Sequence, residues 1–138
     1  MKKIEVFVII LAGLLSVGMW FCVDLPTSTY THLKNWLGQT DAQYAFNISL
    51  MYSVIGIPNL IFPLVGGILM DRVNAHFIML FVVLVILVGQ SVVTGGVLAK
   101  SIPTIVSGRF IFGCGVEVLD VSRSKILMGY FEVLVINF

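Results

Sequence analysis

The chain has 138 residues, of which 59% are hydrophobic and 11% are charged, and its formal net charge at pH 7 is +1. Because soluble domains carry about 25% charged residues, this composition excludes a soluble globular domain and indicates an integral membrane protein. No basic run occurs in the sequence, so nothing points to a nucleic-acid partner. Cys22 and Cys114 lack CxxC spacing, and we expect small buried side chains rather than metal ligands or a disulfide.

The first apolar run covers residues 6–23 and follows a short charged lead. A secretory signal peptide also has a basic start, but its apolar core is usually about 7–15 residues long. The run here is longer and ends without the small residues of a cleavage site, so a first transmembrane helix is preferred. We expect Asp24 and Pro26 to end this helix, because proline cannot donate to a helix, and residues 24–43 to form a polar connection.

Two further uncharged runs occupy residues 46–70 and 77–99, and each exceeds the roughly 20 residues that a membrane-spanning helix needs. The earlier run contains several glycines together with Pro58 and Pro63. We expect it to bend near one of these prolines and to pack against protein. The later run is almost purely aliphatic and aromatic, so we expect it to face lipid more extensively.

The polar break between these runs contains Gly67, Asp71 and Arg72 at the spacing G-x-L-x-D-R. We expect Gly67 to allow close helix contact, and Asp71 to pair with a cation or to accept bonds from a neighbouring helix start. Asn74 is expected to take a left-handed backbone conformation in the turn. A solvated turn in any four-helix protein also needs polar residues, so the spacing alone leaves both interpretations open.

The fourth run, residues 103–124, carries polar residues at steps of three and four, which places them on one side of a helix: Arg109, Gly113, Glu117, Asp120 and Ser124. An ionisable group at membrane depth costs about 2.5–3.5 kcal/mol, so it normally faces a bundle interior or an aqueous cavity. We favour a cavity role for Glu117 and leave Arg109 open between a structural pairing and a ligand. We expect Asp120, Arg123 and Lys125 to mark the exit into the cytosol.

The basic residues predict the orientation. If the amino terminus is cytosolic, four spans place most of them on the cytosolic side: Lys2, Lys3, Arg72, Arg123 and Lys125. Lys34 and Lys100 then lie on the opposite side, which agrees with the positive-inside rule. The predicted fold is therefore an all-α integral membrane protein with four transmembrane helices and a cytosolic amino terminus.

The motifs also occur in a characteristic order. In the fourth run, Gly113 and Gly115 follow the membrane arginine, Arg109, and a polar turn occupies residues 67–73. In both features the sequence is similar to the lysosomal dipeptide uniporters of the major facilitator superfamily. Further matches to these transporters lie at residues 21–26, 52–53 and 58–59. The resemblance runs from about Gly13 to Phe131, nearly the whole chain.

The resemblance implies that residues 1–138 are the amino-terminal portion of a twelve-helix fold that exports dipeptides or small solutes from the lysosome by alternating access. It implies that Glu117 contacts the amino group of the peptide, with Asp24 and Arg109 as further substrate-binding candidates. It also implies an accessory glycosylated lysosomal membrane protein as partner. Val116 stands where the family has glycine, and we expect it to narrow the pocket.

Four spans are one third of such a transporter, so we expect an incomplete or truncated reading frame. The alternative is a four-helix membrane subunit that does not transport. The sequence shows no nucleophile–base pair, phosphate loop or metal cluster, so we expect no enzyme activity, no cofactor and no metal site.

Overall fold

A computed structural model describes residues 3–136 of the chain, and the side chains of residues 6–129 within that range. The described residues form helices joined by short turns: α1 (Lys3–Ser28), α2 (Tyr30–Leu37), α3 (Asp41–Arg72), α4 (Ala75–Leu98) and α5 (Ile102–Ile136). Four of them, α1, α3, α4 and α5, are long and apolar enough to cross a membrane. The all-α integral membrane fold with four transmembrane helices is therefore confirmed, and the predicted spans fall on these four helices.

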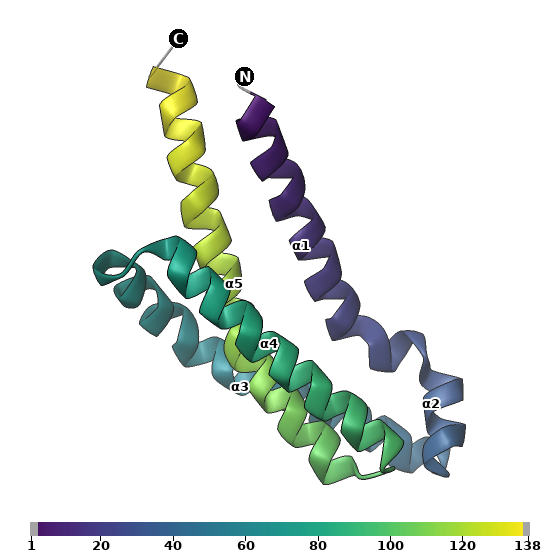
Figure 1. The fold of residues 1–138 in the computed structure, drawn as a ribbon. Coiled ribbons are helices and arrows are strands. Elements are labelled where there is room, and N and C mark those ends of the chain that lie inside the picture. The colour runs from purple at the N-terminus through teal and green to yellow at the C-terminus, as the bar shows by residue number, and fades with distance from the viewer. Residues whose placement is uncertain (1–2, 137–138) are drawn as a thin grey trace.

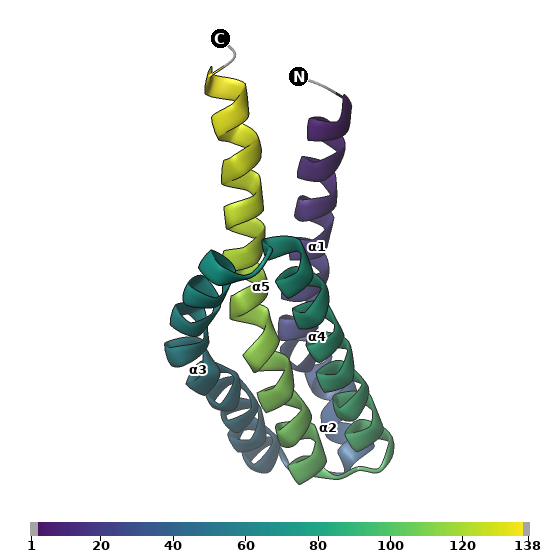
Figure 2. The same ribbon diagram turned by 60° about the vertical axis from the view of Figure 1, so that its left-hand side comes forward.

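The helix α5 is the centre of the bundle. Figure 1 shows α3 and α4 packed along α5, whereas α1 stands apart from α5, and Figure 2 shows the two helices separating toward the marked chain ends. Half of the most apolar stretch of α5 is buried within this chain, against 6% for α1. The short helix α2 and the α4–α5 turn lie at the opposite end of the molecule from the chain ends (Figure 1). A peripheral first helix thus joins a compact three-helix unit.

Glycines build the contact between α4 and α5. A Cβ atom added at Gly89 would lie 2.5 Å from the backbone nitrogen of Phe112, and one added at Gly108 would lie 2.6 Å from that of Val93. Helices in membranes approach most closely where such small residues face one another. Gly95 has open space where its Cβ would be. The position of a glycine around the helix, rather than its presence, therefore determines the contact.

The expectation that the smoother third run faces lipid more than the second is wrong. The most apolar stretches of α3 and α4 are buried to the same extent, 22%. The reason is that Gly89 and Gly96 of α4 are seven residues apart, share one face and both meet α5 backbone. The predicted bend in α3 is present: the helix runs through Pro58 and Pro63, and Figure 2 shows it bowed along its length.

The end of the first helix also differs from the expectation. Asp24 and Pro26 do not end it, because α1 continues to Ser28, and the predicted polar connection contains the separate helix α2. Proline in the last turn of a helix removes one backbone donor without preventing the helical dihedral angles. The carbonyl of Cys22, four residues before Pro26, therefore lacks its usual helical donor. It accepts a hydrogen bond from Arg109 of α5 instead.

The turn between α3 and α4 is built differently from the prediction. Asn74 has φ −57° and ψ 124°, so it is not left-handed; instead it caps α4, with its side-chain oxygen accepting from the His76 backbone nitrogen at 3.0 Å. The predicted close contact at Gly67 is also wrong, since a Cβ there would meet nothing within 4 Å. The adjacent Gly66 makes that contact, against Val118. One residue along a helix turns the side chain by about 100°, which the motif spacing alone does not resolve.

Candidate functional site

Arg109 lies inside the bundle with 1% of its surface exposed. Its Nη1 donates to the carbonyl oxygens of Cys22 at 3.0 Å and Val23 at 3.3 Å, both on α1. Its guanidinium carbon lies 5.9 Å from the ring centroid of Phe112, on its own helix. Of the two possibilities left open by the sequence, the described contacts are those of a structural pairing between α5 and α1.

Pro26 explains why a hydrogen-bond donor from another helix is needed at this point. It cannot donate to the Cys22 carbonyl, so Arg109 supplies the missing hydrogen bond from another helix. The same turn of α1 is bound to α3, because the Tyr44 hydroxyl donates to the Pro26 carbonyl at 3.2 Å. The hydroxyls of Thr27 and Tyr52 also lie 2.7 Å apart. The carboxyl end of α1 is therefore fixed to both α3 and α5.

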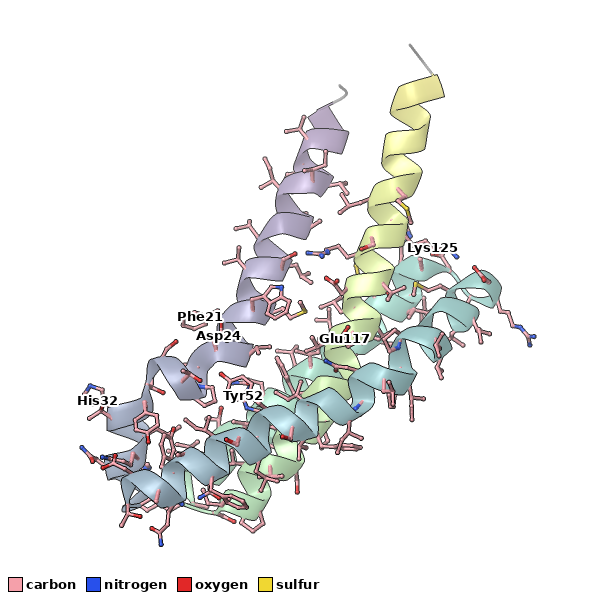
Figure 3. The ribbon with its side chains drawn as sticks, turned by 180° about the vertical axis from the view of Figure 1, so that it is seen from behind. Phe21, Asp24, His32, Tyr52, Glu117 and Lys125 are labelled. Carbon is pink, nitrogen blue, oxygen red and sulfur yellow. The ribbon has the colours of Figure 1, made fainter. Side chains whose placement is uncertain are left out.

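Glu117 lies about midway along the membrane-spanning stretch of α5 and is half-buried. No described side chain forms a hydrogen bond or an ion pair with it; in particular, it is not paired with Arg109. One turn before it, Gly113 packs closely against α3, since a Cβ added at Gly113 would lie 3.1 Å from the Cα atom of Ile55. Figure 3 shows Glu117 on the side of α5 that faces the space between α1 and α3.

A groove between α3 and α5 begins one turn beyond Glu117. It has a volume of about 440 Å³, and Asp120 and Ser124 line it together with Gly67 and Asp71 of α3. Glu117 does not line this groove, but Glu117, Asp120 and Ser124 follow one another at steps of three and four along one face of α5, toward the α3–α4 turn, and we call this row of residues the polar path. A carboxylate on such a path can bind a cationic group of a solute.

The expectation that Asp120, Arg123 and Lys125 mark the exit into the cytosol stays a prediction, but these residues also form contacts that the sequence did not predict. Asp120 and Arg123 form an ion pair one turn apart on α5. Lys125 reaches α3, where its ammonium lies 2.7 Å from a carboxylate oxygen of Asp71 and donates to the Met70 carbonyl at 3.1 Å. The predicted pairing of Asp71 with a cation is thus confirmed. Long basic side chains near a helix end can reach the carbonyls of a neighbouring helix, which sequence spacing does not reveal.

The other predicted residues are placed as follows. Asp24 is exposed near the end of α1 and has no ion-pair partner among the described side chains (Figure 3). Arg72 is exposed at the end of α3. Gly115 is a close contact, since a Cβ there would lie 2.5 Å from Ile86. Val116 does not project into the polar path; it is buried in the core cluster with Met19 and Val23 of α1.

Sequence reasoning missed the tyrosines. Tyr44 and Tyr52 are two helical turns apart, so they share a face of α3, and both hydroxyls contact α1. The signal in the sequence that could have indicated this contact was the pair of tyrosines in a run otherwise rich in glycine and proline. Cys22 and Cys114 are both unpaired and partly buried, and within residues 6–129 no cluster of histidine, cysteine or acidic side chains is suited to a metal.

Fold and site together define a multi-span helical membrane protein with an acidic group in the middle of its fourth span. The chain is similar to the lysosomal dipeptide transporter MFSD1 of three species: Danio rerio with 28% identity over 129 residues, Homo sapiens with 26% over 129 residues and Mus musculus with 25% over 119 residues. The alignments cover 93%, 93% and 86% of this chain. The resemblance predicted from the sequence is confirmed.

These relatives are much longer than the chain. The alignments cover 27%, 27% and 25% of the zebrafish, human and mouse proteins, so the chain spans about a quarter of their length. No protein-family model matches the chain. No solved structure gives a significant match.

Proposed function

We propose that this chain forms the first four membrane helices of a major facilitator transporter that moves dipeptides, or small solutes of similar chemistry, out of the lysosome. The similarity to dipeptide transporters over about nine-tenths of the chain supports this proposal. Transport by alternating access requires two helical repeats around a central site. The four helices would supply one wall of that site.

Glu117 is the residue on which the proposal depends. It is a half-buried carboxylate in the middle of a span, with no cation among the described side chains to neutralise it. Such a group is costly unless a ligand or another helix supplies the positive charge. The ammonium group of a peptide fits this requirement, because a carboxylate and an ammonium form a charge-assisted hydrogen bond in a desolvated site.

Arg109 and Asp24 have supporting roles in this proposal. Arg109 fixes the carboxyl end of α1 through the Cys22 carbonyl, and this end forms the boundary of the space that Glu117 faces. Asp24 is a second acidic candidate at that boundary. The proposed orientation puts the amino terminus and the Asp71–Lys125 pair on the cytosolic side, in agreement with the positive-inside rule.

The direct test is dipeptide uptake by the full-length protein carrying Glu117→Gln. We expect uptake to fall about tenfold to a hundredfold, because a hydrogen bond between charged groups contributes about 1.5–3 kcal/mol and each 1.4 kcal/mol or so is a factor of ten. The control is Asp41→Asn, which removes an exposed carboxylate that pairs with Lys34 at the start of α3. Uptake equal to that of the control, at equal surface expression, would contradict the role of Glu117.

A second candidate is a four-helix subunit that does not transport. The observation in its favour is α1, of whose most apolar stretch only 6% is buried within this chain, which leaves an apolar face that a partner helix can cover. Gel filtration in detergent separates the two proposals, since a subunit co-migrates with a distinct protein that covers α1. The accessory glycosylated lysosomal membrane protein stays a prediction from the resemblance, and the same purification tests it.

A further inference from the structure

Two buried polar atoms of complementary chemistry have no hydrogen-bond partner among the described residues. One is Nε of Arg109 on α5, which is a donor, and the other is Oε1 of Gln90 on α4, which is an acceptor. The Arg109 side chain is buried, and its Nη1 atom already donates to the Cys22 and Val23 carbonyls of α1. A buried donor or acceptor without a partner is costly, so it matters whether these two atoms are placed to satisfy one another.

The close contact between α4 and α5 places Gln90 and Arg109 at similar depth in the bundle. The two helices run in opposite directions, because only residues 99–101 connect them. A Cβ atom added at Gly108 of α5 would lie 2.9 Å from the Gly89 carbonyl oxygen of α4. Gln90 and Arg109 directly follow these two glycines, and one residue advances a helix by only about 1.5 Å. Their backbones therefore lie within a few ångströms of the same depth.

Helical geometry also puts the two side chains on the same side of the α4–α5 pair. One residue corresponds to a rotation of about 100° around a helix. Because α4 and α5 run in opposite directions, one step along each chain from a pair of facing residues turns both side chains toward the same side. Gln90 and Arg109 are each one step beyond the facing glycines.

A groove of about 380 Å³ identifies this side as the one that faces α1. Met79 of α4 and Arg123 of α5 line the groove together with Leu15 of α1. Gln90 follows Met79 by eleven residues, about three helical turns, so these two share a face of α4. Arg109 precedes Arg123 by fourteen residues, about four turns, so these two share a face of α5. Gln90 and Arg109 thus both face α1, in agreement with the bonds from Arg109 to the α1 carbonyls.

The other polar side chains considered for Arg109 are bound elsewhere or are too far away. The hydroxyls of Tyr44 and Tyr52 on α3 both form hydrogen bonds with α1. Glu117 follows Arg109 by eight residues, which is about 12 Å along α5. Gln90 is the neighbouring acceptor whose oxygen is itself in need of a donor.

We propose that Gln90 is the partner of Arg109 on α4, and that its carboxamide oxygen accepts from the Arg109 Nε–H group, directly or across one water molecule. One arginine then links three helices, α1, α4 and α5. Gln90 is a positioning residue in this arrangement, because it holds the guanidinium in the orientation in which Nη1 reaches the Cys22 carbonyl. An amide supplies the acceptor at membrane depth without adding a second charge.

A charged substitution tests whether Gln90 faces the guanidinium. Gln90→Glu is made in the full-length protein with Arg109 and in the Arg109→Met background, and thermal unfolding is followed in one detergent at neutral pH. We expect the shift of the unfolding midpoint to be more favourable by about 2 °C or more when Arg109 is present, because only then does the carboxylate meet a cation. The control is Ser91→Glu, at the adjacent exposed position of α4, which should shift the midpoint equally in both backgrounds. Equal shifts for Gln90→Glu in the two backgrounds would overturn the proposal.

An uncharged substitution keeps the proposal testable if Gln90→Glu does not fold. Gln90→Leu removes the acceptor, so we expect it to lower the midpoint when Arg109 is present and to lower it less, or raise it, in the Arg109→Met background, where neither partner is left unpaired. It should also increase hydrogen exchange at residues 22–28 of α1 several-fold, but only when Arg109 is present. Ser91→Leu is the matched control. Additive midpoint shifts, or an exchange increase that is the same for Gln90→Leu and Ser91→Leu, would contradict a link between Gln90 and Arg109.

Discussion

The Arg109 guanidinium on α5 donates to the Cys22 carbonyl on α1 at 3.0 Å, across a separation of 87 residues in the chain. Pro26 leaves this carbonyl without its usual helical donor, so the bond joins a local defect in α1 to a buried charge on α5. Neither feature is stable alone in a membrane, since an unpaired carbonyl and an unpaired cation are both costly there. Their combination fixes the otherwise peripheral α1 against the bundle.

Replacing Arg109 with methionine should lower the free energy of unfolding by about 1–2 kcal/mol, because the Cys22 carbonyl is then left without a donor. The loss should be smaller by about 1 kcal/mol in the background of Pro26→Ala, where a backbone N–H at position 26 can reach the same carbonyl. Thermal unfolding of the four variants of this cycle in one detergent measures the coupling. Strict additivity of the two substitutions would show that the proline and the arginine act independently.

Adjacent glycines on α4 should respond to alanine in opposite directions. A Cβ at Gly96 would lie 2.8 Å from the backbone nitrogen of Ile105, so Gly96→Ala should force α4 and α5 apart and cost about 1–3 kcal/mol. Gly95 has open space, and Gly95→Ala should be neutral or stabilise the helix by up to about 1 kcal/mol. Unfolding midpoints of the two variants provide the comparison. Similar losses at both positions would mean that the close contact at Gly96 is not what stabilises the α4–α5 pair.

The helices themselves were predictable because long runs without ionisable residues have few alternatives in a membrane. Contacts between helices were not, since they depend on rotation about each helix axis. The motif pointed to Gly67, and the close contact is made by Gly66. Pro26 looked like a helix end because the donor that compensates for it, Arg109, is remote in sequence. The polar face of α5 was visible from spacing, but the reach of Lys125 to Asp71 depends on the path of α3.

The Lys125–Asp71 pair should contribute little to stability, although it joins two helices. The two side chains are 42% and 76% exposed, so solvent screens their attraction. We expect Lys125→Gln and Asp71→Asn each to lower the free energy of unfolding by less than about 1 kcal/mol, and the double variant to lose no more than the larger single loss. Unfolding measured at low and at high salt provides the check. A loss that persists at high salt would instead identify the bond from Lys125 to the Met70 carbonyl as the stabilising one.

The short helix α2 should be anchored mainly through Trp36. Its indole Nε1 donates to the Val97 carbonyl at the end of α4 at 3.0 Å, and the Lys100 ammonium lies 4.7 Å from the centroid of its ring. Trp36→Phe keeps an aromatic face but removes the donor, so we expect it to increase hydrogen exchange of the α2 amides several-fold while global stability changes by about 1 kcal/mol or less.

The other tryptophan provides the control for this experiment. Trp20 is 56% exposed on α1 and forms no described hydrogen bond through its indole, so Trp20→Phe should leave exchange in α2 unchanged. Lys100→Gln should produce a smaller increase than Trp36→Phe, because a cation–π contact at an exposed site is worth only about 0.5–1 kcal/mol. Equal exchange in the wild type and Trp36→Phe would mean that α2 is held by its short connections to α1 and α3. In that case the contact with the α4–α5 turn would play no part in closing this end of the bundle.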